Sequence, residues 1–143
     1  MGKKLANFEV KKAYAVFCPV GQASFAGMIE PMSRAVRHCR DQKIEKLLID
    51  STGLPGLHPP GVTEQYNLVE RLAAAAKSSV KIAHVGSPEW VRAGKFAVLA
   101  AKNRGLEVQN FTSKSTALAW LLKPVAEKAE RRDWGKPDLR LRG

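Results

Sequence analysis

The hydrophobic positions of this chain fall into short apolar runs that are separated by longer amphipathic stretches. The short runs predict five strands, at residues 4–10, 13–20, 45–50, 80–85 and 106–111. In the longer stretches apolar residues recur at helical spacing, which predicts four helices, at residues 25–39, 63–78, 91–103 and 114–122. The inward face of the second helix is expected to comprise Tyr66, Val69, Leu72, Ala73 and Ala76.

Polar and conformationally special residues mark the ends of several predicted helices. Ser24 and Ser113 are expected N-caps, because a serine hydroxyl can accept a bond from an unpaired backbone N–H of the first turn. Gly105 is expected just beyond the third helix, in the C′ position. Pro31 falls inside the first predicted helix, so we expect either a kink there or a separate first turn.

The order of these elements, β-β-α-β-α-β-α-β-α, indicates the fold class. Strands that alternate with helices through short loops form α/β sheets. We therefore expect a single mixed, mostly parallel sheet of about five strands, with an N-terminal hairpin and about four helices. Residues 1–123 are predicted to form the domain, and residues 124–143 a basic C-terminal extension.

Composition narrows the class of protein. The chain has 143 residues, of which 45% are hydrophobic, so intrinsic disorder of the whole chain is not expected. It contains no apolar run long enough to span a membrane and no visible secretory signal. Cys18 and Cys39 are too few for a disulfide framework and lack metal-site spacing, which favours a reducing, cytoplasmic location.

The net charge of +11 suggests nucleic acid or an anionic membrane as a partner. More than half of this excess lies in the two end segments, residues 1–12 and 123–143, whereas the middle of the chain is only mildly basic. Trp134, beside Arg131 and Arg132, is the one aromatic residue set among clustered cations. An alternative function is therefore binding of nucleic acid or anionic membrane through the termini.

Three segments stand out, at residues 47–54 (LLIDSTGL), 101–106 (AKNRGL) and 111–121. Together they resemble the STAS fold of anti-sigma-factor antagonists, in its SpoIIAA-like branch. Residues 47–54 (LLIDSTGL) look like the buried strand of that fold, which ends in Asp-x-Ser/Thr-Gly. Residues 101–106 (AKNRGL) resemble the run before its last strand, and residues 111–121 its closing strand and helix. The resemblance covers roughly residues 8–122.

This resemblance implies a non-enzymatic, regulatory or binding domain of a bacterial protein. Its ligand would be a protein partner or a small molecule, anionic or lipid-like, since lipid-transfer proteins share a related fold. Anti-sigma antagonists are switched by phosphorylation of a serine, which adds negative charge. Ser51 and Thr52 are candidate acceptors, but the register of the fold places the phosphorylated stretch about eight residues later, at residues 58–61, which contain no hydroxyl.

The expected working surface is the loop and helix from residue 50 to 66, with residues 86–92 beside it. Carboxyl ends of parallel strands and the following helix starts are where ligands of open α/β sheets bind. No metal or cofactor is expected. The candidate residues for binding a ligand or partner are Asp50, Ser51, Thr52, His58, Gly61, Thr63, Ser87 and Arg92.

Other chemistry has weaker support in the sequence. Asp50 and His58 could form the acid–base pair of a hydrolase or phosphoryl-transfer enzyme, but no nucleophile motif accompanies them. His38 is expected on the solvated side of a helix, and His84 in the core or on a face of a strand. Cys18 and Cys39 are expected to be inert core residues.

Overall fold

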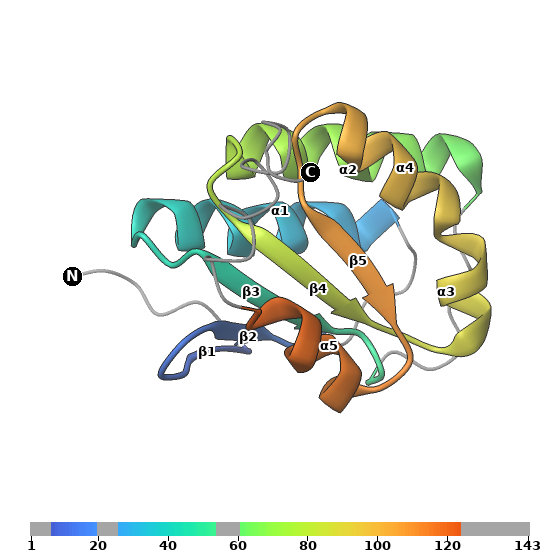
Figure 1. The fold of residues 1–143 in the computed structure, drawn as a ribbon. Coiled ribbons are helices and arrows are strands. Elements are labelled where there is room, and N and C mark those ends of the chain that lie inside the picture. The colour runs from blue at the N-terminus through green and yellow to red at the C-terminus, as the bar shows by residue number, and fades with distance from the viewer. Residues whose placement is uncertain (1–6, 20–25, 54–60, 124–143) are drawn as a thin grey trace, which may run out of the picture.

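The computed structural model describes residues 7–19, 26–53 and 61–123, which form one five-stranded sheet with helices on both faces (Figure 1). The strands follow one another across the sheet in chain order. They are β1 (Phe8–Val10), β2 (Ala15–Phe17), β3 (Lys46–Asp50), β4 (Lys81–Val85) and β5 (Val108–Phe111). The β1–β2 pair is antiparallel and the other pairs are parallel, which confirms the predicted mixed, mostly parallel α/β sheet with an N-terminal hairpin.

The described part of the chain contains five helices. They are α1 (Ala26–Asp41), α2 (Val62–Ala76), α3 (Pro88–Ala93), α4 (Lys95–Asn103) and α5 (Lys114–Leu121). Helices α1, α2 and α4 lie on one side of the sheet, and α5 lies on the other (Figure 1). Within the described residues, no helix is both long and apolar enough to cross a membrane.

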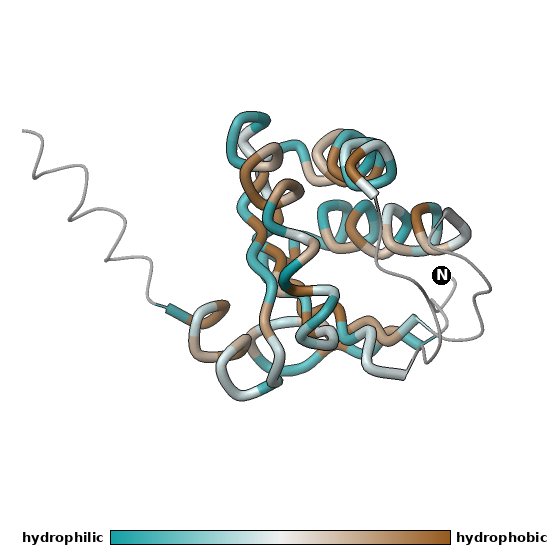
Figure 2. The backbone as a smooth tube through the Cα atoms, turned by 90° about the vertical axis from the view of Figure 1, so that its right-hand side faces the viewer, coloured by the Kyte–Doolittle hydropathy of each residue, from teal (hydrophilic) through white to brown (hydrophobic). Residues whose placement is uncertain are grey.

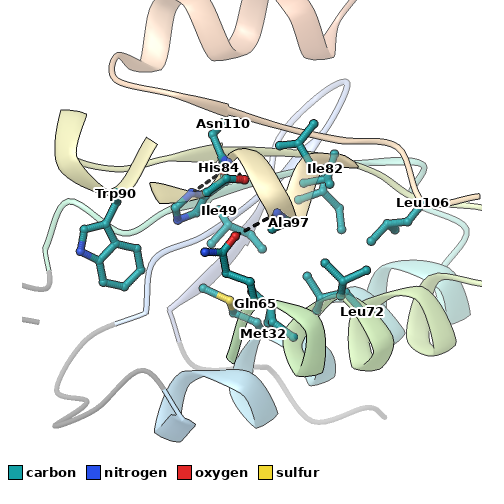
Figure 3. Close-up of a pocket in the computed structure, with 15 residues that line it drawn as sticks. Met32, Ile49, Gln65, Leu72, Ile82, His84, Trp90, Ala97, Leu106 and Asn110 are labelled. Atoms are coloured by element: carbon teal, nitrogen blue, oxygen red, sulfur yellow. Dashed lines mark hydrogen bonds between the residues drawn. The ribbon is translucent and has the colours of Figure 1, made fainter. Parts of the chain in front are cut away.

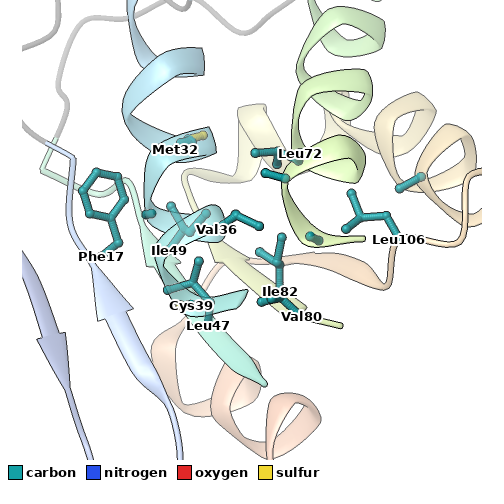
Figure 4. Close-up of a cluster of buried hydrophobic side chains, with 14 of the residues drawn as sticks. Phe17, Met32, Val36, Cys39, Leu47, Ile49, Leu72, Val80, Ile82 and Leu106 are labelled. Atoms are coloured by element: carbon teal, nitrogen blue, oxygen red, sulfur yellow. The ribbon is translucent and has the colours of Figure 1, made fainter. Parts of the chain in front are cut away.

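The larger core fills the space between the sheet and helices α1, α2 and α4 (Figure 4). Side chains alternate between the two faces of a strand, so Leu47 and Ile49 of β3 and Ile82 of β4 point into this core. Met32 and Leu72 meet them from α1 and α2. Hydrophobic and hydrophilic positions alternate around these helices (Figure 2), because each helix buries only one of its sides.

A smaller core lies on the opposite face of the sheet, under α5. The intervening strand residues Val16, Leu48 and Ala83 point this way and contact Ala117 and Leu121 of α5. The central strands are thus covered on both faces, which explains why residues 47–49 form a continuous apolar run.

The prediction of one continuous helix at residues 91–103 is wrong. The chain forms α3 and α4 with Gly94 at the junction, so the described residues contain five helices where about four were expected. Glycine has a low helix propensity, and here its missing side chain makes room for a neighbour. A Cβ on Gly94 would lie 2.6 Å from the side-chain nitrogen of Asn110 on β5.

The inward face of α2 also differs from the prediction in its first turns. Val69, Leu72 and Ala76 are buried as expected, but Tyr66 is exposed and the polar Gln65 is buried in its place. A hydropathy pattern cannot indicate this exchange, because Gln65 is buried for its hydrogen bonds to the α3–α4 region.

The expected helix ends are confirmed where the structure describes them. The Ser113 hydroxyl accepts a bond from the backbone N–H of Thr116, and Gly105 adopts a φ of 74° after α4. Helix α1 runs through Pro31 with no separate first turn. Ser24 and the extension at residues 124–143 lie outside the described residues.

Candidate functional site

A small cavity of about 60 Å³ lies between α2, α4 and the face of β3, β4 and β5 that α1, α2 and α4 cover (Figure 3). Such a volume accommodates a few water molecules or one compact group of a ligand. Its wall is mainly apolar, and the polar side chains in it are Gln65, His84, Trp90 and Asn110. None of the described lining residues is a lysine, arginine, aspartate or glutamate. The apolar lining includes Met32, Ile49, Leu68, Leu72, Ile82 and Leu106.

Three polar side chains from three neighbouring strands form a hydrogen-bonded chain beside this cavity: His84 and Asn110 line it, and Ser51 bonds to His84 without lining it. His84 pairs in register with Ile49 of β3 and with Asn110 of β5, so these residues share one face of the sheet. Ser51 follows Ile49 by two residues and lies on the same face. The Oγ of Ser51 is 2.9 Å from Nε2 of His84, and Nδ1 of His84 is 3.1 Å from Oδ1 of Asn110.

The amide group of Asn110 determines the direction of these bonds. Its side-chain nitrogen donates to the carbonyl of Gly94 at 3.3 Å, so its oxygen faces His84 and can only accept. Nδ1 of His84 therefore bears the proton in the neutral ring, and Nε2 accepts. It follows that the Ser51 hydroxyl donates a hydrogen bond to Nε2 of His84.

Burial lowers the pKa of His84 below its ordinary value of 6.5. The bond to Asn110 and the charge of Asp50 act in the opposite direction, but their effects are smaller. The imidazole is therefore neutral at pH 7, as the bonding pattern requires.

We expect this lowered pKa to make the protein less stable in mild acid. The unfolded chain binds a proton at His84 more readily than the folded protein, so the free energy of unfolding falls as the pH decreases from 7 through 6.5. The contribution of one such group is at most about 1.4 kcal/mol per pH unit. Urea unfolding between pH 7 and pH 5 measures it.

The comparison that isolates this contribution uses two histidine variants. His84→Gln should show a shallower loss of stability with acid than the natural sequence. His38→Gln removes a half-buried histidine on α1, outside the site, and is the matched control. Equal slopes in all three proteins would contradict the assignment to His84.

Two glycines give the network the space that it occupies. A Cβ on Gly86 would lie 3.1 Å from Cε1 of His84, and one on Gly94 would lie 2.6 Å from Asn110. Distances this short are tighter than ordinary van der Waals contact, so larger residues at either position would displace the network.

Gln65 links the helices that close the cavity. Its side-chain nitrogen donates to the carbonyl of Ala93 at 2.8 Å. Its oxygen accepts from the backbone N–H of Ala97 at 2.9 Å (Figure 3). These bonds satisfy backbone groups where the α3–α4 junction interrupts the helical ladder. They also fix the first turns of α2 against α4.

The predicted site residues do not all come together in the structure. Asp50 organises its own turn, because its Oδ1 accepts from the backbone N–H of Thr52 at 3.0 Å and from its hydroxyl at 2.6 Å. Ser51 is buried against His84, whereas Thr52 is exposed. Of these three, Ser51 alone reaches the polar network.

The other candidates mark helix starts or exposed positions. Gly61 is the N-cap of α2, and its N–H donates to the Glu64 side chain at 3.0 Å. Ser87 is the N-cap of α3, where its hydroxyl accepts from Trp90. Thr63 and Arg92 are exposed and do not line the cavity, and His58 lies outside the described residues.

His84, Asn110 and Gln65 were missed as candidate site residues. His84 was expected to be a structural histidine, because a lone histidine in a strand gives no functional signal. The alternation of β4 places His84 on the same face as Ile82, and this could have indicated a strand-end site beside Ser51. No sequence pattern indicates Gln65 or Asn110. Gln65 bonds to backbone groups, and Asn110 bonds to His84, which is distant in sequence.

The remaining histidine and the cysteines lie away from the network. His38 is half-buried rather than fully solvated, because its ring packs edge-on against that of Phe8 of β1, with the ring centroids 5.0 Å apart. Cys39 is buried, and burial raises the pKa of its thiol to about 12, which makes it inert as expected. Cys18 is half-buried, and burial also raises the pKa of its thiol. Within the described residues, no cluster of three potential metal ligands occurs.

A second depression, at the opposite end of the parallel strands, contains several cations that already have structural partners. Arg40 donates to the carbonyl of Ala75 at 3.0 Å, and Lys81 donates to that of Trp120 at 3.0 Å. Glu45 and Glu107 also line it, which offsets the positive charge. The arrangement is less specific than the network around His84.

Comparison of the chain with protein-family models, with characterised proteins and with solved structures found no match. The fold and the site therefore define only a class: an α/β domain with a small, mostly apolar cavity and a serine–histidine–asparagine network at its edge.

Proposed function

We propose that this protein is a STAS-like binding module for a small molecule, and that the ligand places a compact apolar group in the cavity between α2, α4 and the sheet. The cavity itself supports this function best, since it lies in the larger core next to a hydrogen-bonded polar network. Ligand sites in proteins are typically apolar pockets with a few polar groups that set orientation.

The lining also favours a neutral ligand over an anionic one. An anion in this cavity would lose its hydration without meeting a cation, because no described lining residue is a lysine or an arginine. A short alcohol satisfies the chemistry, since its alkyl group is apolar and its hydroxyl can bond to the polar edge. The small volume limits the ligand group to a few heavy atoms, for which affinities in the millimolar range are expected.

Titration with n-butanol tests the proposal. Amide shifts in NMR spectra of the full chain should change saturably at Gln65, His84 and Ala97, with a Kd in the millimolar range. Sodium butyrate should bind at least tenfold more weakly, because its carboxylate must be desolvated. Equal binding of butyrate and butanol would contradict the neutral-ligand assignment.

A cavity-filling variant should abolish this binding. In Ala97→Leu the added methyl groups occupy the space that Ala97 leaves open in the cavity wall. Ala119→Leu is the matched control, because Ala119 is exposed on α5 on the other face of the sheet. If Ala97→Leu binds n-butanol as well as the natural sequence does, the cavity is not the binding site.

A further inference from the structure

The geometry points to a catalytic role for the network: we propose that Ser51, His84 and Asn110 act as a nucleophile, a general base and a positioning residue for acyl transfer from small activated esters. This inference rests on the proposed function, because the cavity would hold the acyl chain. It goes beyond that function by assigning a covalent step to Ser51.

The bond directions match those that a serine nucleophile needs. The Ser51 hydroxyl donates to Nε2 of His84 at 2.9 Å, which is within the range for proton transfer to a base. Oδ1 of Asn110 accepts a hydrogen bond from the Nδ1–H of His84 at 3.1 Å and so holds the ring in the tautomer with a free lone pair on Nε2. A base oriented by a third group is the general pattern of serine and cysteine hydrolases, and asparagine serves as the third group in some of them.

The surroundings hold this arrangement in place. Asn110 is itself fixed by its bond to the carbonyl of Gly94, and Gly86 and Gly94 leave the space that His84 and Asn110 need. His84 lines the cavity, so an acyl chain in the cavity would lie beside the base. Ser51 directly follows β3, the central strand of the sheet.

The backbone near Ser51 indicates which acyl donors are suitable. The N–H of Ser51 donates to the carbonyl of Val85, that of Thr52 donates to Asp50, and that of Gly86 donates to Phe111. These three groups are therefore not available to stabilise an oxyanion. A donor with a good leaving group, such as an aryl ester, is suitable, whereas an amide is not.

The reaction has two balanced steps. In the first, Oγ of Ser51 bonds to the ester carbonyl carbon while its proton passes to Nε2 of His84. The bond from carbon to the aryl oxygen breaks, and the departing phenolate takes that proton. In the second, water attacks the acyl carbon and gives a proton to Nε2, the bond to Oγ breaks, and Ser51 regains its proton. The net change is ester plus water to carboxylic acid plus phenol.

The full chain incubated with p-nitrophenyl acetate tests this proposal. We expect release of p-nitrophenol and one acetyl adduct, located by peptide mass spectrometry at Ser51. Loss of the nucleophile or of the base should reduce release by about a hundredfold. Ser51→Ala and His84→Gln remove those groups, and Ser115→Ala, at an exposed serine of α5, is the matched control that should retain full release.

The positioning role of Asn110 requires a separate comparison. Asn110→Leu has a similar size but no acceptor, and it should lose at least tenfold in the rate of acetylation. Asn110→Asp keeps an acceptor for Nδ1 but loses the donor to the carbonyl of Gly94, so its rate should fall less than that of Asn110→Leu. Thermal melting checks that both variants are folded. Equal rates in the two variants would overturn the positioning role.

The outcomes separate this inference from the proposed function. If n-butanol binds in the cavity but Ser51 gains no acetyl group, or adducts form only on lysines, the catalytic inference is wrong and the binding module stands. If n-butanol does not bind while Ser51 is acetylated, the proposed function is wrong and the network alone accounts for the reactivity. If neither occurs, both are wrong.

Discussion

Ile82→Ala is expected to lower the free energy of unfolding by about 2–5 kcal/mol, because it removes buried methyl groups and leaves a void in the larger core. Ile82 is 1% exposed on β4 and lies in the wall of the cavity. Since domains of this size are typically stable by about 5–15 kcal/mol, the loss is a large share of the total. Urea unfolding at pH 7 measures it.

The same substitution should also change ligand binding, and a control on the other face of the sheet makes this testable. Leu48→Ala removes a fully buried side chain from the smaller core under α5 and should cost a similar free energy. Ile82→Ala enlarges the cavity and should let it accept larger alcohols, such as n-hexanol, whereas Leu48→Ala should not. If both variants gain binding of n-hexanol, the cavity is not the cause.

Gly94→Val is expected to destabilise the protein by about 1–3 kcal/mol and to disrupt the polar network. The Cβ of the new side chain would lie 2.6 Å from the side-chain nitrogen (Nδ2) of Asn110 and 3.1 Å from the backbone carbonyl oxygen of Trp90. Asn110 would have to move, so His84 would lose the acceptor that holds its tautomer. Urea unfolding measures the first effect, and the NMR signals of the His84 ring nitrogens report the second.

Gly61 offers the matched control for this substitution. It has no atom within 4 Å of the place where a Cβ would lie, and its φ of −79° is open to any residue. Gly61→Val should therefore leave the His84 signals unchanged and cost no more than about 1 kcal/mol through the weaker N-cap. A shift of the His84 signals in Gly61→Val as large as in Gly94→Val would contradict the steric explanation.

Sequence patterns predicted the elements well where burial alone determines them. The runs at residues 45–50 and 80–85 are strands, because each contributes apolar side chains to both covered faces. The capping roles of Ser113 and Gly105 were also predicted, since they depend on local backbone groups. Where a polar contact between distant segments determines the structure, as at Gly94 and Gln65, the prediction was wrong.

The spacing of hydrophobic residues and the residues that favour turns are local properties of a sequence. They were sufficient to predict the α/β class, the order of the strands along the chain and the end of a strand at Asp50 and Ser51. Only the tertiary structure brings Ser51, His84 and Asn110 into contact. Residues 51, 84 and 110 come from the ends of three different strands, and their hydrogen bonds depend on the register between those strands and on the space left at Gly86 and Gly94. No local pattern encodes that register, which is why the sequence did not predict this network.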